Sequence, residues 1–392
     1  MRPSLLINSL YIRSAPLSLH TARKGGSLTS SIGASKSGNS GNFICPIDGM
    51  TLIVLYIAAN LQQTFLAMEY RSVKGFTGWA QFGFLLCFIA IGFILAGAAQ
   101  IFAVSLLQPK GISLLNTDAI MKAMLAPENV GVARLNQVLS TFALLFIPAL
   151  LFSFFVNGKK MLWLGFSKHI NPKQIVIGFV IMFLTSLAAG PLFMMSKSII
   201  AHFPSIDATA KKLEDLYNSQ TAVLGNIKTL PELFIGIFIM AFIPAIFEEA
   251  FFRGTLQNLL VKWIKNPIVA ILITSFLFSL VHSSIYLFLS RMALGFTLGL
   301  MYYYTKNIWI NIIAHLINNT IALGGMYVTN GKINANDLDK ANPIAQWIMA
   351  AVACFALVKL FTLLIKYSEK NKAIIEEKEF ALANNDHFQN NN

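Results

Sequence analysis

The stretch ELFIGIFIMAFIPAIFEEAFFRGTLQNLL, residues 232–260, is almost continuous hydrocarbon except for the segment EEAFFRG at 248–254. It is longer than the roughly 20 apolar residues that a helix needs to cross a bilayer. Carboxylates and guanidinium groups are costly at membrane depth, so Glu248, Glu249 and Arg253 indicate a functional site. The stretch therefore predicts a membrane helix with a polar site inside it.

The whole sequence has the composition of a membrane protein. Of its 392 residues, 56% are hydrophobic and 12% are charged, whereas a soluble domain carries about 25% charged residues. The apolar runs do not alternate with polar residues, which excludes a β-barrel. We predict an all-α, polytopic membrane helix bundle of about eight transmembrane helices, at residues 79–107, 135–156, 174–196, 232–261, 267–288, 290–305, 308–328 and 343–366.

The net charge of +13 is spread over short loops and forms no basic stripe with interleaved aromatic residues, so nucleic acid is not an expected partner. Positive charges concentrate on alternate loops, which the positive-inside rule places in the cytoplasm. The residues concerned are Lys159, Lys160, Lys168, Lys173, Lys262, Lys265 and Lys306. This pattern predicts an integral protein of a bacterial inner membrane with both chain ends in the cytoplasm.

The chain ends differ from the apolar core. Residues 1–49 are rich in Ser and Gly and nearly free of acid, and Met68 opens a plausible cytoplasmic leader. Cys45, Cys87 and Cys354 lie far apart and indicate neither a disulfide framework nor a cysteine zinc site. We expect five parts: 1–67 as a disordered or non-native leader, 68–231 as membrane helices with a short interfacial helix in loop 197–231, 232–328 as the functional core, 329–366 as the last span, and 367–392 as a loose polar tail.

Three further polar residues interrupt the apolar spans of the core. His282 lies in FSLVHSS, and His315 and Asn319 lie in HLINNT. Counted at 1.5 Å per residue from the lysine-rich ends of their spans, these residues and Glu248 lie about 14–22 Å deep. They are therefore expected to meet in one layer of the membrane.

Helical spacing divides their roles. Glu249 and Arg253 are four residues apart and share a face, so they can form an ion pair that holds the helix in place. Glu248 is turned by about 100° and has no partner on its own helix. Taken singly, His282, His315 and Asn319 would more often be ordinary hydrogen-bonding groups between helices. Together with a free carboxylate, they supply the base, the polarising groups and the oxyanion donors of a hydrolase.

The same residues carry a resemblance to a known family. EEAFFRG fits an EExxxR motif, FSLVH at 278–282 an FxxxH motif, and HLINN at 315–319 an HxxxN motif. Their order and spacing resemble the CPBP family, which comprises CAAX prenyl endopeptidases and the bacteriocin-processing or bacteriocin-immunity Abi proteins. The resemblance covers about residues 232–328.

What the resemblance implies is an all-helical intramembrane endopeptidase. Glu248 would be the catalytic glutamate that activates a water together with His282, while His315 and Asn319 would bind the oxyanion. The neighbouring ion pair would support Glu248. The family is described both as metalloproteases and as metal-independent glutamate proteases. Either no cofactor or a zinc ion on Glu248, His282 and His315 is therefore expected, although HExxH is absent.

Two other functions stay open at this point. The chain could be a non-catalytic immunity or scaffold protein of the same fold, or, less in keeping with its motifs, a proton-coupled transporter that uses Glu and His as a relay. Transporters usually contain internal repeats, and no convincing repeat is seen. For a protease with the loop pattern of a bacterial membrane protein, a leader peptide or membrane-bound peptide is a better substrate than a prenylated CAAX protein.

Overall fold

The computed structural model describes residues 20–24, 27–31, 70–107, 116–225, 227–329 and 342–389. The chain divides into two compact units, Met1–Ala67 and Met68–Asn392. In the first unit, β1 (His20–Lys24) and β2 (Ser27–Ser31) form an antiparallel hairpin that the sequence analysis did not predict. Cys45 lies outside the described residues.

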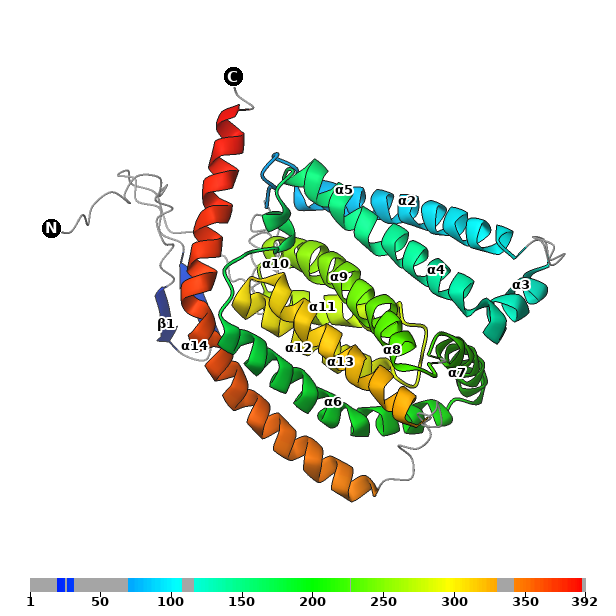
Figure 1. The fold of residues 1–392 in the computed structure, drawn as a ribbon. Coiled ribbons are helices and arrows are strands. Elements are labelled where there is room, and N and C mark those ends of the chain that lie inside the picture. Colours follow the sequence, from blue (N-terminus) through cyan, green and yellow to red (C-terminus); the bar gives the residue numbers. More distant parts are fainter. Residues whose placement is uncertain are drawn as a thin grey trace. The chain divides into compact units, whose positions relative to one another are not determined.

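The described part of the second unit is helical, which confirms the predicted polytopic helix bundle (Figure 1). The longer helices are α2 (Gly78–Ser105), α4 (Val130–Thr141), α5 (Ile147–Val156), α6 (Pro172–Ala201), α7 (Pro204–Leu224), α11 (Pro267–Leu280), α12 (Phe288–Thr305), α13 (Ile308–Val328) and α14 (Pro343–Gln389). The shorter ones are α3 (Thr117–Met124), η2 (Pro127–Asn129), η3 (Phe142–Phe146), η4 (Met161–Leu164), α8 (Leu230–Ile237), η5 (Phe238–Phe242), α9 (Ile243–Glu249), η6 (Ala250–Gln257) and α10 (Asn258–Ile264).

Six continuous helices among the described residues are long and apolar enough to cross a membrane: Gly78–Ser105, Pro127–Val156, Pro172–Ala201, Leu230–Ile264, Ile308–Val328 and Pro343–Asn384. Large apolar side chains on them point outward, such as Ile94 at 71% and Phe355 at 72% exposure. Such a surface is stable against lipid and not against water. The chain is therefore an integral membrane protein.

The predicted span at 267–288 is wrong in its extent. α11 ends at Leu280, and residues 281–287 form a turn that leads into α12. The polar pair Ser283–Ser284 breaks the helix, and Ser283 adopts a left-handed backbone with φ of 55°. Hydropathy did not indicate this end, because apolar residues continue on both sides of it.

Asparagine side chains fix several helix starts. Asn171 and Gln174 form a capping box at the start of α6, while Asn266 caps α11 and Asn307 caps α13. Each satisfies a backbone N–H that the first helical turn leaves without an intrahelical acceptor. Pro172 and Pro267 follow their caps at the first helical position, where proline needs no N–H.

Three π-helical turns interrupt the two helices beside the predicted site. η3 has the sequence FALLF before Ile147–Pro148, and η5 has FIMAF before Ile243–Pro244. Proline lacks an N–H and crowds the preceding turn, which accounts for the widened turn in both places. The two helices thus share an eight-residue pattern, FxxxFIPA, which is far shorter than the several-span repeats of transporters. The third π turn, η6, begins directly after Glu249.

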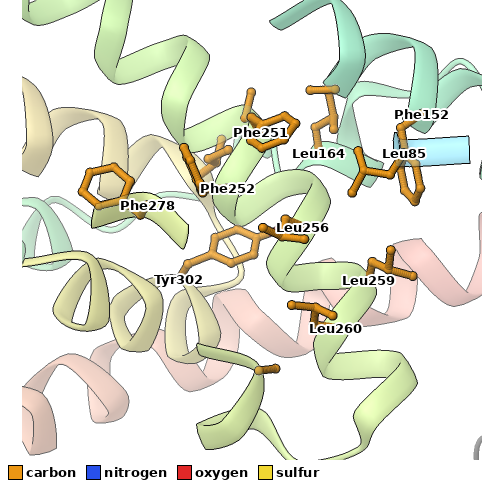
Figure 2. Packing of buried hydrophobic residues seen from close by; sticks show 14 of the residues in the cluster. Leu85, Phe152, Leu164, Phe251, Phe252, Leu256, Leu259, Leu260, Phe278 and Tyr302 are labelled. Atoms are coloured by element: carbon orange, nitrogen blue, oxygen red, sulfur yellow. The ribbon is translucent and has the colours of Figure 1, made fainter. Parts of the chain in front are cut away.

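The main core lies around the helix that carries EEAFFRG. Figure 2 shows Tyr302 beside Leu256, and Leu85 beside Phe152, on either side of this helix. In a bilayer such contacts stabilise by close packing, because lipid is as apolar as the side chains themselves. The core therefore holds η6 and α10 against α2, α5 and α12.

The lysine-rich loops meet at one end of the bundle. Lys74 donates to the Phe154 carbonyl oxygen at 2.8 Å, and Asn307 donates to the carbonyl oxygens of Ser167 and His169, each at 3.0 Å. These contacts join the segment before α2 to the end of α5, and the turn before α13 to the loop before α6.

The predicted loose tail is wrong as far as Gln389, because α14 runs on as a helix through these residues. Its membrane part packs along α6 (Figure 1). Beyond the span, Glu379 lies 3.9 Å from Lys306, and Lys378 is hydrogen-bonded to His169. Contacts with the loops, which a hydropathy profile cannot detect, hold the polar extension in place.

Candidate active site

The last residue of α9 and the first turn of η6 form the ion pair predicted from spacing. Arg253 Nη1 donates to Glu249 Oε1 at 2.9 Å, and both side chains are fully buried. Arg253 Nη2 donates to the Gly295 carbonyl oxygen at 3.0 Å. The pair therefore joins its own helix to α12 without leaving an unpaired charge between them.

Glu249 also holds α13. His315 Nδ1 lies 2.9 Å from Glu249 Oε1, and Asn311 Nδ2 donates to Glu249 Oε2 at 3.2 Å and to the Leu298 carbonyl oxygen at 2.7 Å. The family resemblance implies that this glutamate supports Glu248, whereas none of the three motifs includes Asn311. The sequence feature that could have indicated Asn311 is its position four residues before His315, which itself lies four residues before Asn319.

Phe278, the aromatic residue of the FxxxH motif, lies at the centre of these groups. The Arg253 guanidinium lies 4.8 Å from its ring centroid, and the His282 and His315 rings lie 4.7 Å and 6.2 Å away. Phe252 packs edge-on against it at 5.2 Å. The Phe278 ring thus packs against the buried guanidinium and lies beside both imidazoles.

Glu248 and the two histidines converge on one point. Glu248 Oε2 lies 3.9 Å from His282 Nε2 and 3.8 Å from His315 Nε2. This oxygen is buried and has no hydrogen-bond partner in the part of the chain that the structure describes. Glu248 Oε2 therefore lies near both histidines and forms no hydrogen bond with them.

The outer ring atoms fix the tautomers. His282 Nδ1 lies 2.6 Å from the Phe278 carbonyl oxygen, and His315 Nδ1 is bound to Glu249. Because carbonyl and carboxylate oxygens only accept, Nδ1–H donates in both rings. In neutral rings the Nε2 lone pairs then face the Glu248 carboxylate. Three hydrogen-bond acceptors therefore surround a space that suits a hydrogen-bond donor.

His282 lies beyond the end of α11 and not within a span as predicted. Its carbonyl oxygen accepts from Arg291 Nη1 at 3.1 Å, and the next residue is the left-handed Ser283. Strained backbone of this kind persists where surrounding contacts hold it, and it is common at functional sites. The side chain remains 27% exposed, more than Glu248 at 14% or His315 at 8%.

Asn319 is not joined to these groups by a contact among the described residues. Asn318 Nδ2 approaches its Oδ1 at 3.5 Å, and Asn318 in turn accepts from Ser186 of α6 at 2.6 Å. Asn319 shares the α13 face of Asn311 and His315 by its spacing.

In the observed arrangement, the side chains of the candidate site do not form a metal centre. Within the described ranges no three His, Cys, Asp or Glu side chains have an arrangement that could hold a metal ion. Tetrahedral zinc at about 2.1 Å from its ligands requires ligand atoms about 3.4 Å apart, and the two separations from Glu248 Oε2 are longer. The donor types suit zinc, but the distances do not.

Fold and site together define a polytopic helical membrane protein with a glutamate–histidine centre buried in its bundle. Residues 230–321 match the family model described as "Type II CAAX prenyl endopeptidase Rce1-like", and this range contains all the predicted site residues. This match and the relative described next support a protease of the CPBP family, in agreement with the motifs.

One relative is a protein of Bacillus subtilis (strain 168) called "Putative membrane peptidase YdiL". The two are 34% identical over 102 residues, which are 26% of this chain and 40% of the relative. The match therefore spans about two fifths of the relative's length. No solved structure matches the chain.

Proposed function

We propose that this protein is an intramembrane endopeptidase that hydrolyses a peptide bond with a water activated by Glu248. One observation carries the proposal: the unpartnered Glu248 Oε2 faces the Nε2 atoms of His282 and His315 at 3.9 and 3.8 Å. A water about 2.8 Å from both Glu248 Oε2 and His282 Nε2 could donate one hydrogen bond to each.

In this proposal each group has one task. Glu248 accepts a proton while the water oxygen bonds to the scissile carbonyl carbon, and His282 orients the water. His315, whose Nδ1–H is held by Glu249 and whose Nε2 must be protonated for this step, and Asn319 donate to the oxyanion of the tetrahedral intermediate. The C–N bond then breaks, and the proton taken up by Glu248 passes to the departing nitrogen. Carboxylic acid and amine are released, and Glu248 returns to its ionised form.

The surroundings support a substrate in or near the bilayer. The site lies on helices whose outer surfaces suit lipid, which favours a membrane-associated or leader-peptide substrate. The alternating lysine-rich loops support a bacterial inner membrane with both termini in the cytoplasm as the setting.

The test compares wild type with Glu248→Gln in one membrane preparation. The protein is reconstituted with membrane-fraction peptides, and new peptide termini are identified by mass spectrometry. Gln keeps the size of Glu but cannot take a proton from water, so we expect cleavage to be abolished in folded protein. Glu377→Gln, which changes an exposed carboxylate of α14, is the matched control and should cleave normally.

A second arm examines the oxyanion role. Loss of one donor costs roughly a hundred- to a thousandfold in turnover in hydrolases, and Asn319→Ala should fall in that range. Cleavage that persists in Glu248→Gln would reject the protease proposal and favour a relay or scaffold role.

Chelation followed by metal analysis of the purified protein tests the cofactor. Glu248, His282 and His315 would hold zinc if the site tightened by a few tenths of an ångström, and zinc would lower the pKa of a bound water. The metal-free route that we propose predicts undiminished cleavage after chelation. Loss of activity that returns with zinc would contradict it.

A further inference from the structure

α7 turns a polar face toward the loop that carries His282. Asp207 Oδ1 accepts from the Tyr286 hydroxyl at 2.6 Å, and the Tyr217 ring lies 4.7 Å from the Arg291 guanidinium. The hydrogen bonds from Lys211 and Tyr286 hold the pKa of Asp207 below its ordinary value, so it is an ionised acceptor at neutral pH. An amphipathic surface helix ordinarily turns an apolar face inward. The polar contacts that α7 makes toward the loop therefore need another explanation.

The central contact of this face is buried. Glu214 Oε2 accepts from the Ser284 hydroxyl at 2.6 Å, and the two residues are only 9% and 3% exposed. Glu214 Oε1 is buried without a hydrogen-bond partner in the described part of the chain. A buried carboxylate with one unsatisfied oxygen is costly for the fold.

Ser284 ties α7 to the backbone around His282. Its hydroxyl oxygen also accepts from the Leu287 N–H at 3.3 Å, which closes the 281–287 turn internally. Only the left-handed Ser283 separates it from His282. The turn is thus fixed from α7 by Glu214, through Ser284, and from α12 by Arg291, through the His282 carbonyl oxygen.

We propose that Glu214 is a positioning residue that acts through Ser284 to hold His282 at its working distance from Glu248. The inference rests on the proposed protease function and adds α7 to it as the element that sets the geometry of the site. A shift of 1 Å in a catalytic group can cost about a hundredfold in rate. Detachment of α7 is therefore expected to lower turnover without removing any group that touches the substrate.

The kinetic test uses four variants and one matched control. Glu214→Ala and Ser284→Ala should each lower kcat by about ten- to a hundredfold with KM within about twofold. The double variant should be no slower than Ser284→Ala, because that substitution already removes the contact that Glu214→Ala removes. Glu214→Gln keeps an acceptor oxygen and should retain most of kcat. Tyr286→Phe deletes an equally short hydrogen bond to α7 and should have little effect.

A second readout does not depend on cleavage. Diethyl pyrocarbonate modifies imidazole nitrogens, and mass spectrometry gives the rate at each histidine. His282 should react severalfold faster in Ser284→Ala than in wild type, while the exposed His202 serves as an internal standard. Tyr286→Phe should leave the His282 rate unchanged.

Two outcomes would overturn the inference. One is a His282 rate that is equal in wild type and Ser284→Ala. The other is a Tyr286→Phe protein as impaired as Ser284→Ala, which would reduce α7 to a structural element. A wild type that cleaves nothing would contradict the proposed function alone, because the modification rates would still test the positioning.

Discussion

Adjacent glutamates in EEAFFRG have opposite environments, although they are chemically identical. Both Glu249 oxygens are used, by Arg253, His315 and Asn311, whereas Glu248 Oε2 has no hydrogen-bond partner among the described residues. Buried charges persist when paired, and an unpaired one is available for chemistry. The local pair was predictable because it follows from helical spacing. The Asn311 contact was not, because it joins positions 62 residues apart whose helix rotation depends on packing.

Among single-residue changes, Arg253→Ala should destabilise the protein strongly. It would leave Glu249 buried without its cation, and breaking a buried pair costs about 3–5 kcal/mol. Lys211→Ala is the control, because it breaks a pair of the same spacing whose lysine is 67% exposed, and such pairs contribute at most about 1 kcal/mol. Thermal unfolding in detergent measures both. Equal melting temperatures for wild type and Arg253→Ala would contradict the structural role of the pair.

Helix geometry around the site depends on a π turn and a close backbone approach, which the spacing of apolar residues does not indicate. η6 is a π turn, yet the pattern of apolar residues predicted a uniform helix through it. The final glycine of EEAFFRG has a packing reason: a Cβ on Gly254 would lie 2.6 Å from the Leu164 carbonyl oxygen. This approach brings η4 against η6. Neither the π turn nor the contact follows from composition, because both depend on where a distant backbone lies.

Gly254→Ala should therefore lower stability by about 1–3 kcal/mol, the usual cost of overpacking a closely fitted core. Gly97→Ala in α2 is the matched control, since a Cβ there meets nothing within 4 Å. That control should be neutral or slightly stabilising, because Ala favours helix over Gly by about 1 kcal/mol. A Gly254→Ala protein that melts with the wild type would show that the two backbones can separate without cost.

At the scale of the whole molecule, charge distribution and hydropathy predicted the features that do not depend on tertiary packing. They located the helices of the bundle and grouped the loops that meet at one end. They failed where a helix end or a polar extension depends on tertiary contacts, as at Leu280 of α11 and in α14 beyond the span. The β1–β2 hairpin likewise had no signal in a Ser/Gly-rich stretch.

Cysteine labelling tests the membrane orientation predicted from the lysine-rich loops. In a protein lacking Cys45, Cys87 and Cys354, Lys160→Cys should react with an impermeant maleimide only after the cytoplasmic face is opened. Asp215→Cys on α7 should react in intact cells. Both positions are exposed, so burial does not confuse the comparison. Reaction of both from the same face would refute the predicted topology.

The shortness of α11 has a consequence for the lipid around it. Fourteen residues extend about 21 Å as a helix, whereas the hydrocarbon layer is about 30 Å thick. Such a hydrophobic mismatch is relieved when the bilayer thins locally, at a cost of a fraction of a kcal/mol per ångström. Lipid beside α11 would then dip toward the turn that holds His282 and bring headgroups and water near the buried carboxylate. Acyl chain length would thus control access to the site, with longer chains closing it.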